Sequence, residues 1–205
     1  SKLSFINDLK AKLYKTHKAF ASNPLLLTIM LMTYSTYGEI PAKMHVFYSK
    51  AYEAMARLHD ATKQSFKRVL RTGLTPEEFV KPFSEFCART YEKEMLKFTE
   101  NAFSLYMDKV IANPEQKLTG LSSKDFLVDL TENLCLMYRE GDSYYFIHRS
   151  FQEYFAAVYF STTYDKDLLI VGQLYENKRL RHSGDMSFEM LCDMIPNKVE
   201  RQMFL

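Results

Sequence analysis

Apolar residues recur every three or four positions over much of this chain, which is the spacing of amphipathic helices. In the first third they predict three helices, over residues 4–20, 24–34 and 44–60. Asn23 is expected to cap the second helix, with Pro24 at its first position, where the missing N–H costs nothing. Gly38 and Pro41 are expected to end it. These three helices predict a first helical unit.

A second run of helical spacing begins at Thr75. Thr75, Pro76 and Glu78 supply a cap, a first-turn proline and a glutamate at the third position, and an apolar face follows as far as Tyr91. Pro82 lies within the first two turns, so we expect it to bend the start of the helix without destroying it. The polar stretch before this helix places the domain boundary near residue 74.

Farther along, the pattern changes between helix and strand. It predicts helices over residues 101–110 and from 122 onward, then β-prone runs over 134–138 and 143–148. The turn-rich segment between the two runs is typical of a hairpin. Three helices followed by a hairpin is the order of a winged-helix domain. The sequence therefore predicts a mainly α fold, with a helical domain over residues 1–73, a winged-helix domain with a small β-hairpin over 74–164, and the start of a further helical segment over 165–205.

Residues 144–157, YYFIHRSFQEYFAA, place one imidazole beside the start of a helix with one aromatic face. Ser150 and Glu153 have the S-x-x-E spacing of a capping box, so we expect the helix to begin at Ser150, two residues after His148. The first N–H groups of a helix lack partners within it, and its dipole is positive there, which favours a phosphate or carboxylate. His148 is therefore a candidate anion contact. The alternative is structural, a histidine that ends a strand and donates to the core.

The block FIHRSFQEYFAA, residues 146–157, resembles the signature near the end of the winged-helix domain in NACHT proteins, a branch of the STAND NTPases that includes bacterial antiphage proteins and animal NOD-like receptors. A second block, NPLLLT at residues 23–28, resembles a segment of the helical domain that follows the NTPase core in that family. The resemblance implies that Pro24 packs against the nucleotide base and that His148 reaches the terminal phosphate of bound ADP. Ser22 is a departure, since the family often has glycine there.

The resemblance also implies an NTPase core outside this sequence. The chain has no G-x-x-x-x-G-K-[ST] phosphate loop, and its six glycines are scattered. Together with the first residue, Ser1, this leads us to expect a piece of a larger protein. ADP or ATP would bind the full-length parent and not this fragment tightly. The expected partners are the parent's own NTPase core and, on activation, other copies of the parent, in antiphage defence or innate immunity.

Composition narrows the picture only slightly. Hydrophobic residues make up 47% and charged residues 25% of 205 positions, which is ordinary for a globular protein. A net charge of +2 is too small to argue for a polyanion partner. The longest apolar run, residues 24–32, is far below the roughly 20 residues that cross a bilayer, so we expect a cytoplasmic protein without a membrane partner.

The spacing of the cysteines and histidines does not predict a metal site. Cys87, Cys135 and Cys192 are widely separated among apolar neighbours and are expected to be reduced core residues. The five histidines do not form any cluster with metal-ligand spacing. No serine, cysteine or carboxylate has a partner at a spacing typical of an activated nucleophile or an acid–base pair, so no catalytic residue is assigned.

Two other functions remain open from the residues. Many winged helices place the helix before the wing in the DNA major groove. Here that helix sets Lys124 against the carboxylates of Asp125, Asp129 and Glu132. An excess of carboxylates repels phosphates, which argues against nucleic acid. A helical protein-interaction module without nucleotide is the other alternative.

Overall fold

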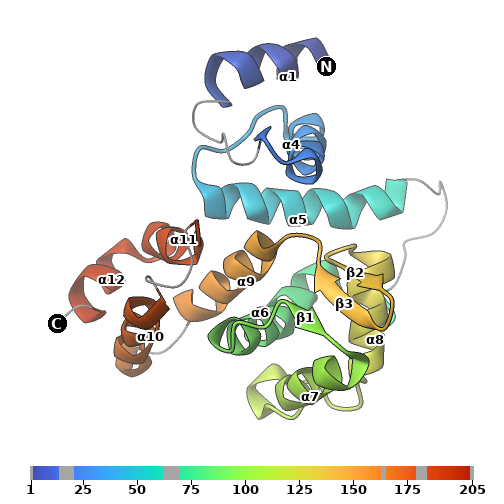
Figure 1. Cartoon of the computed structure of the whole chain (residues 1–205), viewed down its shortest axis with the longest axis vertical. Coiled ribbons are helices and arrows are strands. Elements are labelled where there is room, and N and C mark those ends of the chain that lie inside the picture. Colours follow the sequence, from blue (N-terminus) through green and yellow to red (C-terminus); the bar gives the residue numbers. More distant parts are fainter. Residues whose placement is uncertain (1, 14–20, 62–69, 163–164, 179–183, 204–205) are drawn as a thin grey trace. The chain divides into compact units, whose positions relative to one another are not determined.

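The structure, a computed structural model, describes residues 2–13, 21–61, 70–162, 165–178 and 184–203 (Figure 1). The chain divides into two compact units, Ser1–Phe66 and Lys67–Leu205, and each is described by itself. It is mainly helical with a small antiparallel sheet, which confirms the predicted fold class. Among the described residues, no helix combines the length and apolar character that a bilayer span requires.

The first unit is built from helices whose ends follow local sequence signals. Its elements are α1 (Lys2–Asp8), a π-helical turn η1 (Leu9–Leu13), α4 (Pro24–Tyr37) and α5 (Met44–Ala61). Asn23 caps α4 as predicted, because its Oδ1 accepts the N–H groups of Leu25 and Leu26 at 3.0 and 3.2 Å. Gly38 ends α4 with φ 81°, a conformation that glycine adopts without strain, and donates its N–H to the Tyr34 carbonyl. Part of the helix predicted over residues 4–20 lies outside the described residues.

The second unit contains the remaining elements. They are α6 (Pro76–Glu92), β1 (Lys97–Phe98), α7 (Glu100–Ile111), the 3-10 turn η2 (Pro114–Gln116), α8 (Ser123–Val128), the π-helical turn η3 (Asp129–Asn133), β2 (Met137–Glu140), β3 (Ser143–Phe146), α9 (Arg149–Ser161), α10 (Asp165–Lys178), α11 (Ser187–Met194) and α12 (Pro196–Gln202). The strands form an antiparallel sheet in the order β1-β3-β2. Strand β1 was not predicted, because two residues are too few to show an alternating pattern.

Helix α6 forms as its sequence signals predict, and a hairpin forms too, but its strands β2 and β3, called the wing below, differ in bounds from the predicted runs over 134–138 and 143–148. Thr75 Oγ1 accepts the Glu78 N–H at 3.2 Å, and Glu78 Oε2 accepts the Thr75 N–H at 2.8 Å, which completes the capping box. The helix continues through the buried Pro82 to Glu92. In the wing, Gly141 takes φ 58° at the turn between β2 and β3.

An aromatic core joins α6 to α9. The Phe83 ring lies edge-on to Phe155 with centroids 4.7 Å apart, and it also contacts Phe86 and Phe146. Helix α9 buries Phe151, Tyr154 and Phe155 of its predicted aromatic face, but the burial extends around the helix, since residues 150–157 are all buried. The reason is that α9 packs against both α6 and α11 and so has little free surface (Figure 1).

The three cysteines differ in their surroundings. Cys87 is fully buried in α6, and burial raises the pKa of its thiol well above its ordinary value. Cys135 and Cys192 are only half-buried, so the prediction of core cysteines holds for Cys87 alone. In the part of the chain that the structure describes, none of the three forms a disulfide.

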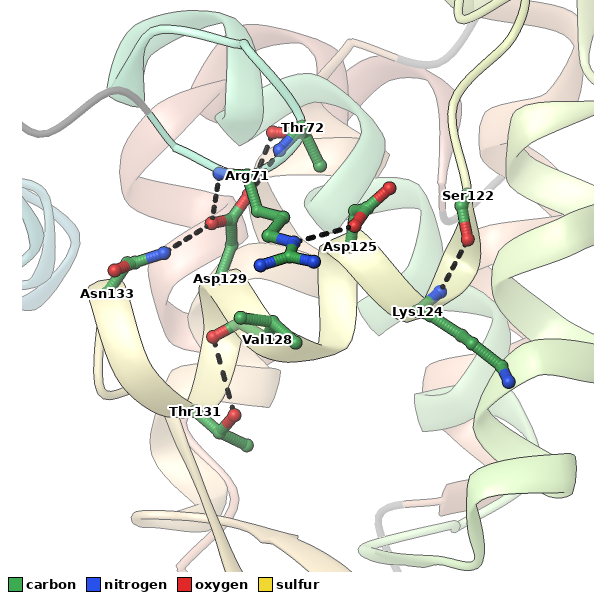
Figure 2. A network of polar contacts seen from close by, with 9 residues as sticks. All are labelled: Arg71, Thr72, Ser122, Lys124, Asp125, Val128, Asp129, Thr131 and Asn133. Atoms are coloured by element: carbon green, nitrogen blue, oxygen red, sulfur yellow. Dashed lines mark hydrogen bonds and ion pairs between the residues drawn. The ribbon is translucent and has the colours of Figure 1, made fainter.

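Asp129 is fully buried. It therefore does not add a carboxylate to the surface of the helix before the wing, which was expected when DNA binding was judged unfavourable. Its carboxylate accepts the N–H groups of Arg71 and Thr72 at 2.7 and 3.0 Å, the Thr72 hydroxyl at 2.8 Å and the Asn133 amide at 2.6 Å (Figure 2). Asp125 adds an ion pair to Arg71 at 3.2 Å. Both carboxylates therefore attach the segment before α6 to α8 and η3.

We expect Asp129→Asn to destabilise the second unit by about 3 kcal/mol, since all four partners are donors and an amide has only one acceptor oxygen to offer them. Urea denaturation and hydrogen exchange of the Arg71 and Thr72 amides measure the effect. The matched control is Glu132→Gln on the exposed side of η3, which should change stability by less than about 0.5 kcal/mol. Equal stability of the two variants would contradict this role.

Candidate functional site

His148 lies at a direct junction between the wing and α9. Ile147 still donates its N–H to the Leu136 carbonyl at 3.0 Å, so the hairpin pairing extends to the residue before the histidine. Helix α9 begins at the next residue, Arg149, and His148 is its N-cap, with extended φ of −155°. The histidine is therefore held from both sides by regular structure.

The His148 ring itself caps the helix. Its Nδ1 accepts the Ser150 N–H at 3.2 Å and lies 2.6 Å from the Ser150 hydroxyl oxygen. A backbone N–H can only donate, so Nδ1 carries no proton and, in the neutral ring, Nε2 does. Burial, and then the charge of Arg149, lower the pKa of His148, which favours this neutral form. The geometry thus fixes both the orientation and the tautomer of the imidazole.

The predicted capping box at Ser150 is wrong. Ser150 is already the second residue of α9 and is buried, with its hydroxyl against the His148 ring. Glu153 does not reach back, because its Oε2 accepts the N–H of Met186 at 3.2 Å and its Oε1 lies 3.4 Å from the Arg149 Nε. Packing of α9 on α11 brings the Met186 N–H to the Glu153 carboxylate. His148 caps the helix in place of Ser150.

The start of α9 is consequently less open to an anion than the sequence suggested. The Ser150 N–H is taken by the imidazole, and the Phe151 N–H bonds to the His148 carbonyl at 3.1 Å. Among the described residues, nothing accepts a hydrogen bond from His148 Nε2, and the side chain is only half-buried. Of the two ring nitrogens of His148, Nε2 is therefore the one that can still donate to an anion.

Glu153 belongs to a buried polar cluster between α9 and α11. Its neighbour Asp185 accepts the N–H and hydroxyl of Ser187 at 2.8 and 2.6 Å and the Tyr91 hydroxyl at 2.7 Å. Burial, and then the charge of Asp185, raise the pKa of Glu153 to about 7, against the opposing effects of the Met186 amide and Arg149. Folding thus buries a carboxyl group that titrates near neutral pH.

The two residues predicted to contact nucleotide lie in different units. Pro24 is the exposed first residue of α4 in the first unit. His148 caps α9 in the second unit. The hydrogen bonds described for each residue lie within its own unit.

A buried carboxylate on α6 was missed by the sequence reasoning. Glu85 is fully buried, and its Oε1 accepts the Arg89 Nε and terminal nitrogen at 2.9 and 2.6 Å. Its Oε2 accepts the side-chain amides of Asn113, at 2.9 Å, and of Gln116. The i, i+4 spacing of Glu85 and Arg89 was a usable signal for the ion pair. No local pattern could have indicated the amides, which lie 28 and 31 residues away.

The comparisons with known proteins identify no family. No protein-family model matches the chain, and comparison with curated proteins and with solved structures finds no match. The family resemblance therefore depends on the two sequence blocks alone. In the part of the chain that the structure describes, no group of three or more histidine, cysteine or acidic residues could hold a metal ion.

We expect Glu153→Gln to remove much of the pH dependence of folding near neutrality. A carboxyl whose pKa rises from 4.5 to about 7 on folding favours the folded state below pH 4.5, and this contribution is lost as the pH rises through 7. The shift corresponds to roughly 3 kcal/mol. Glutamine stays neutral, so the variant should be more stable than the parent at pH 8 and similar at pH 5.

Thermal unfolding of both proteins between pH 5 and 8 measures this difference. Glu132→Gln, at an exposed position, is the control and should keep the pH profile of the parent. Parallel profiles for Glu153→Gln and the parent would show that Glu153 does not titrate in this range.

Proposed function

We propose that this chain is the regulatory region of a NACHT-type STAND NTPase. In this proposal the helical domain and the winged helix close over ADP bound to the NTPase core of the same parent chain. Activation releases them, and copies of the parent then assemble and signal. The cofactor is ADP or ATP in the full-length protein, and the setting is the cytoplasm, in antiphage defence or innate immunity.

The observation that carries the proposal is the fixed His148 imidazole. Its Nδ1 is bound to the helix that it caps, and its Nε2–H remains available from a half-buried position. A donor with a fixed direction suits one oxygen of a terminal phosphate, because little entropy is lost when the contact forms. In the family that the block at residues 146–157 resembles, the residue at this position contacts the phosphate.

The winged-helix order of elements supports the same proposal. The element order α6, β1, α7, α8, β2, β3 with sheet order β1-β3-β2 places the histidine directly after the wing. A contact at that junction would attach the whole unit to the nucleotide, since α9 is packed against both α6 and α11. Loss of the contact would then favour the open state by a coupling of about 1–3 kcal/mol.

A protein-interaction module without nucleotide is the second candidate. Helix α10 exposes Leu169 and Ile170 at 45% and 64% of their surfaces, which is unusual for neighbouring large apolar side chains. Under this alternative, the function would depend on that face and not on His148.

His148→Asn separates the two roles of the histidine. Asparagine is a favourable N-cap, so its side-chain oxygen should keep the bond from the Ser150 N–H while the Nε2–H donor is lost. In the full-length protein we expect ADP affinity to fall roughly 10-fold or more and basal signalling to rise, with little change in thermal stability. His148→Ala should show the same loss of ADP affinity and a further loss of about 1 kcal/mol of stability.

Calorimetric titration with ADP measures the affinity of each variant and of the parent, and a signalling assay measures their basal activity. The control is Leu169→Ser with Ile170→Ser on α10, which should leave ADP affinity unchanged. Unchanged ADP affinity in His148→Asn would contradict the proposal, and loss of signalling in the α10 variant alone would favour the interaction module.

A further inference from the structure

Helices α10, α11 and α12 form one body, the C-terminal arm, at the end of the second unit (Figure 1). Both α10 and α11 pack against α12. A Cβ at Gly172 of α10 would lie 2.5 Å from the carbonyl oxygen of Met203, the residue that follows α12, so the two backbones approach each other very closely. The three helices can therefore move together.

The C-terminal arm is attached to α6 and α9 through aromatic rings and a buried polar cluster. The Tyr175 ring of α10 lies 6.2 Å from the Tyr91 ring of α6. Glu153 of α9 accepts the N–H of Met186, just before α11, at 3.2 Å. Asp185 accepts the Tyr91 hydroxyl at 2.7 Å. These polar contacts hold the start of α11 to both α6 and α9.

Glu153 is the group in this cluster whose charge changes near neutral pH. The other charged and titratable groups around the cluster, among the described residues, are Arg149 on α9, Asp185 before α11, Cys192 on α11, Tyr91 on α6 and Tyr175 on α10. Burial raises the pKa values of the two tyrosine hydroxyls and of the thiol, so all three stay uncharged. Arg149 lies 3.4 Å from the Glu153 carboxylate and partly offsets its charge.

We propose that the C-terminal arm detaches from α6 and α9 as a local unit, and that a proton on the Glu153 carboxyl group keeps it attached. In the attached arm, Glu153 is 5% exposed and shares the cluster with the Asp185 carboxylate, so a second negative charge there is unfavourable. Detachment places the ionised Glu153 in water, while Arg149 stays beside it on the same helix. The core between α6 and α9, with Phe83 against Phe155, remains intact in the detached state.

The direction of the pH effect follows from this proton. The pKa of Glu153 is about 7 in the attached arm and returns toward the ordinary 4.5 once the group is in water. Attachment is therefore favoured at low pH, and this contribution is lost as the pH rises through 7. The detached population should increase roughly 10-fold between pH 6 and 8. The proposal does not involve nucleotide, so it can be tested on the present chain.

Hydrogen exchange of the whole chain at pH 6 and pH 8, followed amide by amide, tests the proposal. Protection factors correct for the intrinsic effect of pH on exchange. They should be lower for the buried Met190 and Leu191 of α11 than for the buried Phe86 and Cys87 of α6, and in α11 they should fall roughly 10-fold between pH 6 and 8. Low concentrations of urea should affect α11 less than α6, because local detachment exposes less surface than unfolding of the unit.

Glu153→Gln provides the matching variant, since glutamine is uncharged at both pH values. Its α11 protection factors should be the same at pH 6 and 8. The control is Glu189→Gln, which removes a charge from an exposed position of α11 and should keep the 10-fold change of the parent. Equal protection of α11 and α6 in the parent would overturn the proposal, as would a parent without the pH effect or a Glu153→Gln variant that retains it.

Discussion

The burial of α9 between α6 and α11 is the constraint on which the second unit depends. Because residues 150–157 are all buried, each polar side chain among them needs a partner inside the protein. Gln152 donates to the Thr90 hydroxyl and the Met95 carbonyl at 2.9 and 2.8 Å. Glu153 accepts the N–H of Met186, the residue before α11. The Ser150 hydroxyl lies against the ring of His148, which caps α9. Packing thus decides the polar contacts of α9.

The same constraint gives His148 its properties. The wing ends and the buried helix begins at this one residue, so the imidazole serves as a structural cap on one nitrogen and keeps the other available. The structural and functional interpretations of the histidine are therefore compatible. A neutral imidazole can donate its Nε2–H to a phosphate without any change in its own protonation. A protonated ring would lose the cap, because a protonated Nδ1 cannot accept the Ser150 N–H.

Local signals in the sequence predicted local structure well. The caps at Asn23 and Thr75, the end at Gly38 and the hairpin turn each depend on a few adjacent residues, and each forms as expected. The S-x-x-E spacing of Ser150 was misleading because tertiary packing gave both side chains other partners. The partners of Asp129 and Glu85 lie tens of residues away, so no pattern within one helix could have indicated them. The position of His148 beside a helix start was predictable, but its role as the cap was not.

The most direct test of the proposed nucleotide switch is the nucleotide content of the full-length protein that contains this chain, purified without added nucleotide. The protein would be denatured in acid and the released compounds separated by chromatography. A resting state closed by His148 predicts stoichiometric ADP, and much less of it in His148→Asn. A full-length protein that releases no nucleotide, and that gains none on incubation with ADP, would contradict the account.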